Sequence, residues 1–178
     1  MIIETDRLIL RPFQLKDLSH LHLYRNDPLC ARYQAWENTT IEELKFFIKE
    51  NMTRSLDDQQ IQIALAAKET DQLIGDIFIA KKGHTITLGF TTSPPHQRKG
   101  YMLEALTAFI PYLQKRFPSS EIICLVHPGN HASEQLLKNF TLSKKNTSNR
   151  SIAMSLSLKS KRQIKRIADP IIRSTILF

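Results

Sequence analysis

The sequence predicts one α/β domain built on a mixed, largely antiparallel sheet with helices on both faces. Three short apolar runs, at 61–68, 73–80 and 85–91, are joined by polar turns, which is typical of an antiparallel meander. A helical pattern over 99–116 then leads into the apolar run EIICLV at 121–126, so a helix connects two strands. The length of 178 residues, 42% of them hydrophobic, suits one such domain.

The N-terminal segment predicts a strand followed by two helices. Residues 7–13 alternate apolar and polar side chains as a half-buried strand does, and 16–25 space their leucines as a helix does. The sequence Asn-Asp-Pro at 26–28 predicts the end of that helix. The stretch TTIEE at 39–43 resembles an N-cap with an acidic first turn, so a second helix is expected to run to Met52.

The C-terminal segment predicts a strand, a short helix and then a closing hairpin. The continuous apolar run at 121–126 is expected to be a strand covered on both faces. A short helix over 130–139 follows, and 140–143 and 151–158 form the hairpin. The complete expected order is β-α-α-β-β-β-α-β-α-β-β, which describes a mixed sheet with helices on both faces.

The charge is unevenly distributed and divides the chain. The net charge is +8, and residues 159–178 hold six cations against one acid, so +5 lies there and +3 in the rest. We therefore expect one domain at 1–158 and a basic appendage at 159–178. A body of +3 does not favour nucleic acid as a partner. The isoleucines of the appendage either pack on the body or on a second copy in a homodimer, which we favour, or belong to an arm that contacts RNA or anionic lipid.

The composition predicts a protein of the cytoplasm. Two distant cysteines, Cys30 and Cys124, form no disulfide framework and fit a reducing compartment. The chain starts with an alternating segment that has no apolar signal core, and no apolar run approaches the roughly 18 residues of a membrane span.

The segment QRKGYM at 97–102 predicts an anion site. It joins the strand at 85–91 to the long helix, whose first backbone N–H groups are free and point toward an anion. Gly100 lets the backbone approach a phosphate closely and tolerates positive φ, and Arg98 and Lys99 add positive charge. The alternative is an ordinary turn between a strand and a helix.

Three blocks in this order resemble the GNAT superfamily of N-acetyltransferases. The loop QRKGYM matches the phosphate loop of the family through its glycine, and VHPGNHASEQLLKNF at 126–140 resembles the family's strand with Asn, Ala, Ser and a short helix. The block NDPLCARYQAWENTTIEELKFFI at 26–48 resembles the subgroup of ribosomal-protein N-terminal acetyltransferases. The resemblance covers about residues 5–158.

The resemblance implies acetyl-CoA as co-substrate. Backbone amides of the loop would hold its diphosphate, and amides near the end of the strand 85–92 would bind the pantetheine arm and polarise the thioester carbonyl. Met102 departs from the small residue that the family has there, so the phosphate site is expected to be tighter or shifted. The implied cofactor-binding residues are Thr91, Thr92, Gln97, Arg98, Lys99, Gly100, Tyr101, Met102, Asn130 and Ser133.

The resemblance also implies Ser133 as the general acid for the departing thiolate. The usual base is missing, because Thr87 stands where many relatives have Glu, and 135–168 contain no Asp or Glu. Glu37 is the best local candidate for the base, against a solvated loop charge or loss of the proton to water. Trp36 and Tyr33 are either an aromatic wall for the substrate or a cap on the N-terminal core.

The implied function is an acetyl-CoA-dependent N-acetyltransferase in which a primary amine attacks the thioester directly in a ternary complex. The acceptor is a small-molecule amine or a protein N-terminus. The alternative is a noncatalytic acyl-CoA-binding or RNA-associated module, because of the missing carboxylates and the basic appendage. No metal is expected, since the spacing of Cys124, His127 and His131 lacks further ligands and Cys124 suits an apolar strand.

Overall fold

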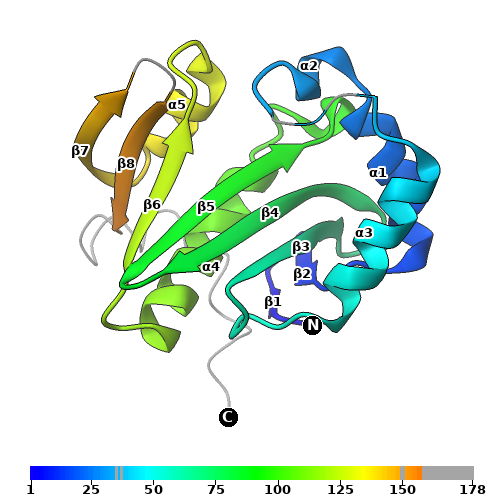
Figure 1. Ribbon diagram of the computed structural model, residues 1–178, viewed down its shortest axis with the longest axis horizontal. Helices are drawn as coiled ribbons and strands as arrows, with labels where there is room; N and C mark the ends of the chain where they lie inside the picture. The colour runs from blue at the N-terminus through cyan, green and yellow to red at the C-terminus, as the bar shows by residue number, and fades with distance from the viewer. Residues whose placement is uncertain (35, 37, 149–150, 158–178) are drawn as a thin grey trace.

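The computed structural model describes residues 1–34, 36, 38–148 and 151–157 and places them in an eight-stranded sheet flanked by helices (Figure 1). The strand order is β1-β2-β3-β4-β5-β6-β8-β7, and every neighbouring pair is antiparallel except β5 and β6, which are parallel. The strands are β1 (Ile3–Glu4), β2 (Leu8–Arg11), β3 (Gln60–Ala67), β4 (Leu73–Lys82), β5 (Thr85–Thr92), β6 (Glu121–Val126), β7 (Thr141–Ser148) and β8 (Ser151–Ser157). The helices are α1 (Leu18–Arg25), α2 (Pro28–Ala31), α3 (Ile41–Thr53), α4 (Tyr101–Arg116) and α5 (His131–Leu137), with 3-10 turns at Leu15–Asp17 and Pro94–His96.

The predicted order of elements is confirmed, with the additional strand β1 and the additional helix α2. Helix α2 begins where the pattern predicted only the end of α1. One carboxylate oxygen of Asp27 accepts the backbone N–H groups of Leu29 at 2.8 Å and Cys30 at 3.3 Å. Pro28 occupies the first turn, where its fixed φ suits a helix and its missing N–H costs nothing. The same sequence therefore ends one helix and caps the next.

The two longer helices begin at the residues that the sequence indicated. Thr40 caps α3, because its Oγ1 accepts the N–H of Glu43 at 3.2 Å and its own N–H donates to that glutamate's carboxylate at 2.8 Å. Gly100 is the N-cap of α4, and Phe117 is its C-cap.

Two apolar clusters lie on opposite faces of the sheet. Alternate residues of β3 point to opposite sides, so Ile63 and Leu65 belong to one cluster and Ala64 to the other. The first cluster lies under α4 and includes Leu106, Phe109 and Ile110 of that helix. The second lies under α1 and α3 and includes Leu21, Tyr24, Leu44 and Ile48.

The prediction that β6 is covered on both faces is wrong. Ile122, Cys124 and Val126 are at most 3% exposed, but Leu125 is 52% exposed. The cluster under α1 and α3 contains no residue of β6, and Figure 1 shows these two helices over the β2–β4 side of the sheet. One face of β6 is therefore left uncovered by these helices.

Strands β5 and β6 pair along only part of their length. Their register runs from Thr85 opposite Glu121 to Leu88 opposite Cys124. Beyond that point β5 continues to Thr92, while β6 pairs with β8 on its other side. Figure 1 shows the two strands parting toward α2 and α5. The backbone N–H and C=O groups of residues 89–92 that point toward β6 therefore form no hydrogen bonds with that strand.

Candidate active site

The free end of β5 is held from the side of α2. The Thr91 hydroxyl accepts a hydrogen bond from Gln34 Nε2 at 3.2 Å, and the Thr92 carbonyl accepts one from Gln97 Nε2 at 3.0 Å. Cys30 Sγ lies 3.5 Å from the same carbonyl, and burial raises the pKa of this thiol to about 12, so it remains a donor. The predicted pantetheine-binding residues Thr91 and Thr92 are thus fixed by neighbours on one side while their strand is open toward β6.

The loop before α4 has the geometry of an anion site. Arg98 has φ of 60° and Gly100 has φ of 78°, so two residues of this short loop are left-handed. The first helical hydrogen bond runs from Glu104 N–H to the Gly100 carbonyl at 3.0 Å. The backbone N–H groups of Arg98, Lys99 and Gly100 have no acceptor within the described part of the chain. These free amides at the positive end of the helix dipole lie in an exposed loop.

Met102 does not enter this loop. Its side chain is 4% exposed and belongs to the apolar cluster under α4. The Met102 side chain therefore does not narrow the phosphate site, because the helical turn after Gly100 directs residue 102 into the core. The expectation that the site is shifted stays a prediction. The backbone N–H of Met102 remains in the first turn, where it lacks an intrahelical partner.

Asn130 and Ser133 lie together at the start of α5, after β6. Asn130 caps this helix, because its side-chain oxygen accepts the backbone N–H of Ser133 at 3.1 Å. Its amide nitrogen and the Ser133 hydroxyl make no hydrogen bond to other described residues. Both side chains are half-buried, so each keeps a polar group available to a ligand.

Tyr33 connects the two sides of the parted strands. It follows α2, and its hydroxyl donates to the Gly129 carbonyl in the loop between β6 and α5 at 2.8 Å. Its ring centroid lies 5.1 Å from that of His127. The predicted substrate residue Tyr33 therefore borders the segment that leads into Asn130, rather than the core under α1 and α3.

Trp36 has a different environment. The Arg25 guanidinium lies 4.7 Å from the Trp36 ring centroid and 4.3 Å from that of Phe47, and Arg25 is only 7% exposed. Trp36 therefore packs on the edge of the N-terminal core, as the cap interpretation requires. The candidate base Glu37 lies outside the described residues.

A buried carboxylate that the sequence analysis missed lies beside the free end of β5. Asp76 of β4 is directly opposite Thr91 and is 1% exposed. It accepts hydrogen bonds from the Tyr24 hydroxyl and from Gln62 Nε2, the latter at 2.6 Å. Burial raises the pKa of Asp76, although the positive charge of Arg25 acts in the other direction. The available signal was an aspartate within the apolar strand sequence LIGDIFIA.

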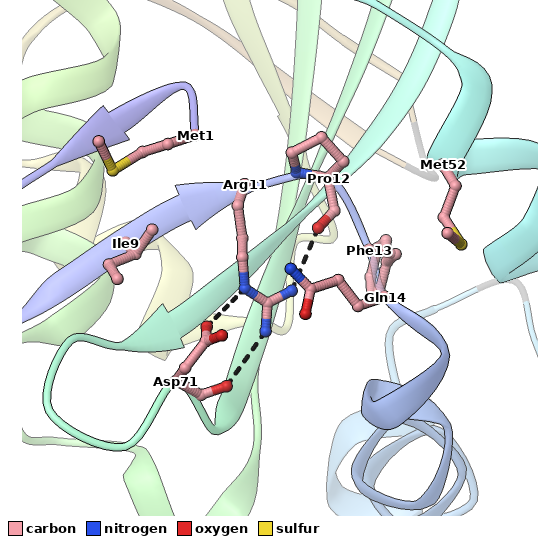
Figure 2. A pocket seen from close by; sticks show the side chains of 8 residues that line it. All are labelled: Met1, Ile9, Arg11, Pro12, Phe13, Gln14, Met52 and Asp71. Atoms are coloured by element: carbon pink, nitrogen blue, oxygen red, sulfur yellow. Dashed lines mark hydrogen bonds and ion pairs between the residues drawn. The ribbon is translucent and has the colours of Figure 1, made fainter.

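A separate hollow lies at the end of β2, beside Met52 of α3 (Figure 2). Its volume is about 490 Å³, and Arg11 has the only basic side chain among the described residues that line it. The guanidinium is already occupied, because it donates to both oxygens of Asp17 at 2.8 and 2.9 Å and to Asp71 Oδ1 at 2.6 Å. The described residues that line this hollow include none from the parted strands, and the Arg11 guanidinium is not available to a ligand there.

No group of three or more histidine, cysteine, aspartate or glutamate side chains gathers as a metal site among the described residues. Burial raises the pKa of the Cys124 thiol to about 12, so it stays protonated as a core residue. Within the same residues, no helix is both long enough and apolar enough to span a membrane.

Comparisons with known proteins agree with this geometry. Residues 7–141 match the family model described as acetyltransferase (GNAT) domain. The uncharacterized N-acetyltransferase YnaD of Bacillus subtilis (strain 168) is 31% identical over 140 residues, which cover 78% of this chain and 80% of that protein. A candidate ribosomal-protein-serine acetyltransferase of Vibrio cholerae has a TM-score of 0.73 at 21% identity, covering 87% of this chain and 95% of that one. A spermidine N-acetyltransferase of Vibrio cholerae, solved with CoA and spermine, has a TM-score of 0.69 at 16% identity, covering 86% and 96%.

Proposed function

The chain belongs to the acetyltransferase (GNAT) family, and we propose that it transfers the acetyl group of acetyl-CoA to a primary amine by direct attack in a ternary complex. One observation carries this proposal. The parallel strands β5 and β6 part after Leu88 and Cys124, and the chain leaving β5 forms the left-handed loop with free amides before α4. The open strand edge suits the extended arm of such a donor, and the anion site that directly follows it along the chain suits the diphosphate.

The donor would lie with its diphosphate on the backbone amides of residues 98–102 and its pantetheine arm along the free edge of β5. The predicted amide of Gln97 is not available for this, because it donates to the Pro94 carbonyl at 3.2 Å. Backbone N–H groups near Thr91 and Thr92 would then face the thioester carbonyl. Such donors stabilise the tetrahedral oxyanion more than the ground state, and removing one typically costs about 3 kcal/mol of transition-state stabilisation. Asn130 would bind the arm from the opposite side with its free amide nitrogen.

The reaction forms a C–N bond and breaks the C–S bond. The attacking amine must lose a proton, and the departing thiolate takes one. Ser133 is our candidate for donating to the thiolate, because its hydroxyl has no competing hydrogen bond among the described residues. Glu37 is the proposed acceptor of the amine proton, with loss to water as the alternative. Asp76 is too deeply buried to receive this proton directly.

The acceptor class remains a small-molecule amine or a protein N-terminus. One structural neighbour is named for a ribosomal-protein serine and another for spermidine, so proteins of this fold are named for both classes. Tyr33 is the proposed acceptor-side aromatic residue, because it crosses the parted strands and contacts the loop at Gly129. Trp36 would contribute through its stacking on Arg25 rather than by free contact.

A panel of amines with acetyl-CoA tests the proposal, with release of free thiol as the measurement. The panel should include polyamines, amino sugars and peptides with free serine N-termini. Thiol release that depends on both acetyl-CoA and one amine class is the expected result. Binding of acetyl-CoA without thiol release for any amine would contradict transfer and leave only a binding module.

A further inference from the structure

Arg7 lies immediately before β2 but reaches the loop before α4, more than 90 residues away in sequence. Its Nε donates to Glu104 Oε2 at 2.6 Å, and its Nη1 donates to the Lys99 carbonyl at 3.1 Å. Its guanidinium carbon lies 4.6 Å from the ring centroid of Tyr101. One side chain therefore contacts residues on both sides of Gly100.

Glu104 gives this contact an electrostatic role. The carboxylate is 7% exposed and lies in the first turn of α4, close to the amides that would bind an anion. Its Oε1 accepts the Thr5 hydroxyl at 2.6 Å and the Arg7 backbone N–H at 3.1 Å, and its Oε2 pairs with the Arg7 guanidinium. An unpaired carboxylate here would repel a diphosphate, so the ion pair removes a negative charge that opposes binding.

One nitrogen of the Arg7 guanidinium has no partner among the described residues, and it faces the loop before α4. Arg7 Nη2 makes no hydrogen bond to the described residues, and the side chain is 49% exposed. Nη2 lies 3.6 Å from the position that a Cβ atom would take at Gly100. The two N–H groups of Nη2 therefore lie beside Gly100, the residue that would let phosphate groups approach the backbone. A guanidinium whose other two nitrogens already donate hydrogen bonds can bind a phosphate oxygen with little further loss of side-chain entropy.

We propose that Arg7 binds the diphosphate of the donor. Through its hydrogen bonds to the Lys99 carbonyl and the Glu104 carboxylate, it also holds the start of α4 in the conformation that binds this diphosphate. This inference rests on the proposed function, because the diphosphate is that of acetyl-CoA. It adds a side-chain donor from the residue before β2 to a site otherwise made of loop and helix backbone.

The test compares two acyl donors, acetyl-CoA and S-acetylpantetheine, which carries the same thioester but no diphosphate. Replacing Arg7 alone would leave the buried Glu104 unpaired and endanger folding. The main variant is therefore Arg7→Gln with Glu104→Gln, which substitutes a neutral pair of similar shape. Arg116→Gln is the matched control, because Arg116 is an exposed arginine paired with Asp57 at 2.5 Å.

The double variant should raise the KM for acetyl-CoA by about 10- to 100-fold, the range of a lost hydrogen bond to a charged group. Its kcat and its kinetics with S-acetylpantetheine should stay within about twofold of wild type, as should Arg116→Gln with both donors. Arg7→Lys should give an intermediate KM, since it keeps a charge but loses the planar fork.

Two results would overturn the inference. An equal loss with both donors would make the ion pair merely structural, and an unchanged KM for acetyl-CoA would remove Arg7 from the site. If wild type neither binds acetyl-CoA nor transfers acetyl, the proposed function itself fails. Binding that is lost in Gly100→Glu but intact in the Arg7 variants would defeat this inference alone.

Discussion

The carbonyl oxygen of Thr91 occupies the space that a Cβ atom at position 75 would need, closer than real Cβ contacts allow. Gly75 lies in β4, and Thr91 lies in the part of β5 that has left β6. The absence of a side chain at Gly75 therefore sets how closely the two strands approach at the candidate thioester site.

Gly75→Ala should displace the Thr91–Thr92 backbone, because the neighbouring atom is backbone and has no alternative rotamer. We expect a loss of about 1 to 3 kcal/mol in the free energy of unfolding, measured by urea denaturation, and a higher KM for acetyl-CoA. Gly89→Ala is the stability control, since a Cβ there would meet only ordinary contacts with Phe78 at 3.6 Å. Equal stability losses in the two variants would argue against the close approach as the cause.

Gly100→Glu should abolish the rise in melting temperature that acetyl-CoA produces in the wild type. A ligand held by the folded state alone stabilises it by mass action, and the new carboxylate would stand beside the amides meant for phosphate. Gly100→Ala separates charge from backbone strain, because it shares the positive φ of 78° but adds no charge. Retained stabilisation in the glutamate variant would move the coenzyme site elsewhere.

Ser133→Ala should lower kcat by about 100-fold or more if its hydroxyl protonates the thiolate, with the KM for acetyl-CoA nearly unchanged. The substitution leaves the helix cap intact, because Asn130 binds the backbone N–H of Ser133 and not its side chain. Steady-state kinetics with a saturating acceptor measure both constants. Weaker acetyl-CoA binding at normal turnover would make Ser133 a binding residue instead.

Asp76→Asn should become more stable relative to wild type as the pH rises from about 4 to 7. Burial raises the pKa of Asp76, so the folded state binds this proton more tightly than the unfolded state. Its contribution to stability is therefore complete below about pH 4 and is lost as the pH rises through the folded pKa. Urea unfolding at several pH values measures the difference.

Asp71→Asn is the control with the opposite sign. The hydrogen bond from Lys16, with that from Arg11, lowers the pKa of Asp71, so its contribution is present above about pH 4 and lost as the pH falls through the folded pKa. Relative to wild type, this variant should gain stability toward acid. A pH-independent difference for Asp76→Asn would mean that burial does not perturb its carboxyl group.

The elements that the sequence predicts correctly are those whose signals are local. Two helix starts illustrate this: the capping pair of Thr40 and Glu43, and the glycine before α4. Each acts within one helical turn, so the amino-acid sequence is sufficient to find it. The Pro28 position shows the limit of such signals. The same residues that stop α1 also start α2, and only the hydrogen bonds of Asp27 reveal the second role.

The candidate site could be predicted as far as its backbone loop, and the side chains around it could not. Gly100 marks a loop through its own conformation. Arg7, in contrast, only begins an ordinary alternating sequence pattern, and Asp76 lies in β4, two strands from β2 in the sheet. The pairings of Arg7 with Glu104 and of Tyr24 with Asp76 span 97 and 52 residues. Local periodicity carries no information on such contacts, because they exist only after the strands have taken their order in the sheet.

The parting of β5 and β6 likewise depends on the tertiary structure. The β5 segment TITLGFTT is rich in β-branched residues and the β6 segment EIICLV is an apolar run, and nothing in their composition indicates that pairing stops at Leu88 and Cys124. Beyond these residues β6 keeps its pairing with β8 as far as Val126, and β5 keeps its pairing with β4 as far as Thr92. The edge on which the proposed donor would lie therefore opens between two strands that each stay paired on their other side.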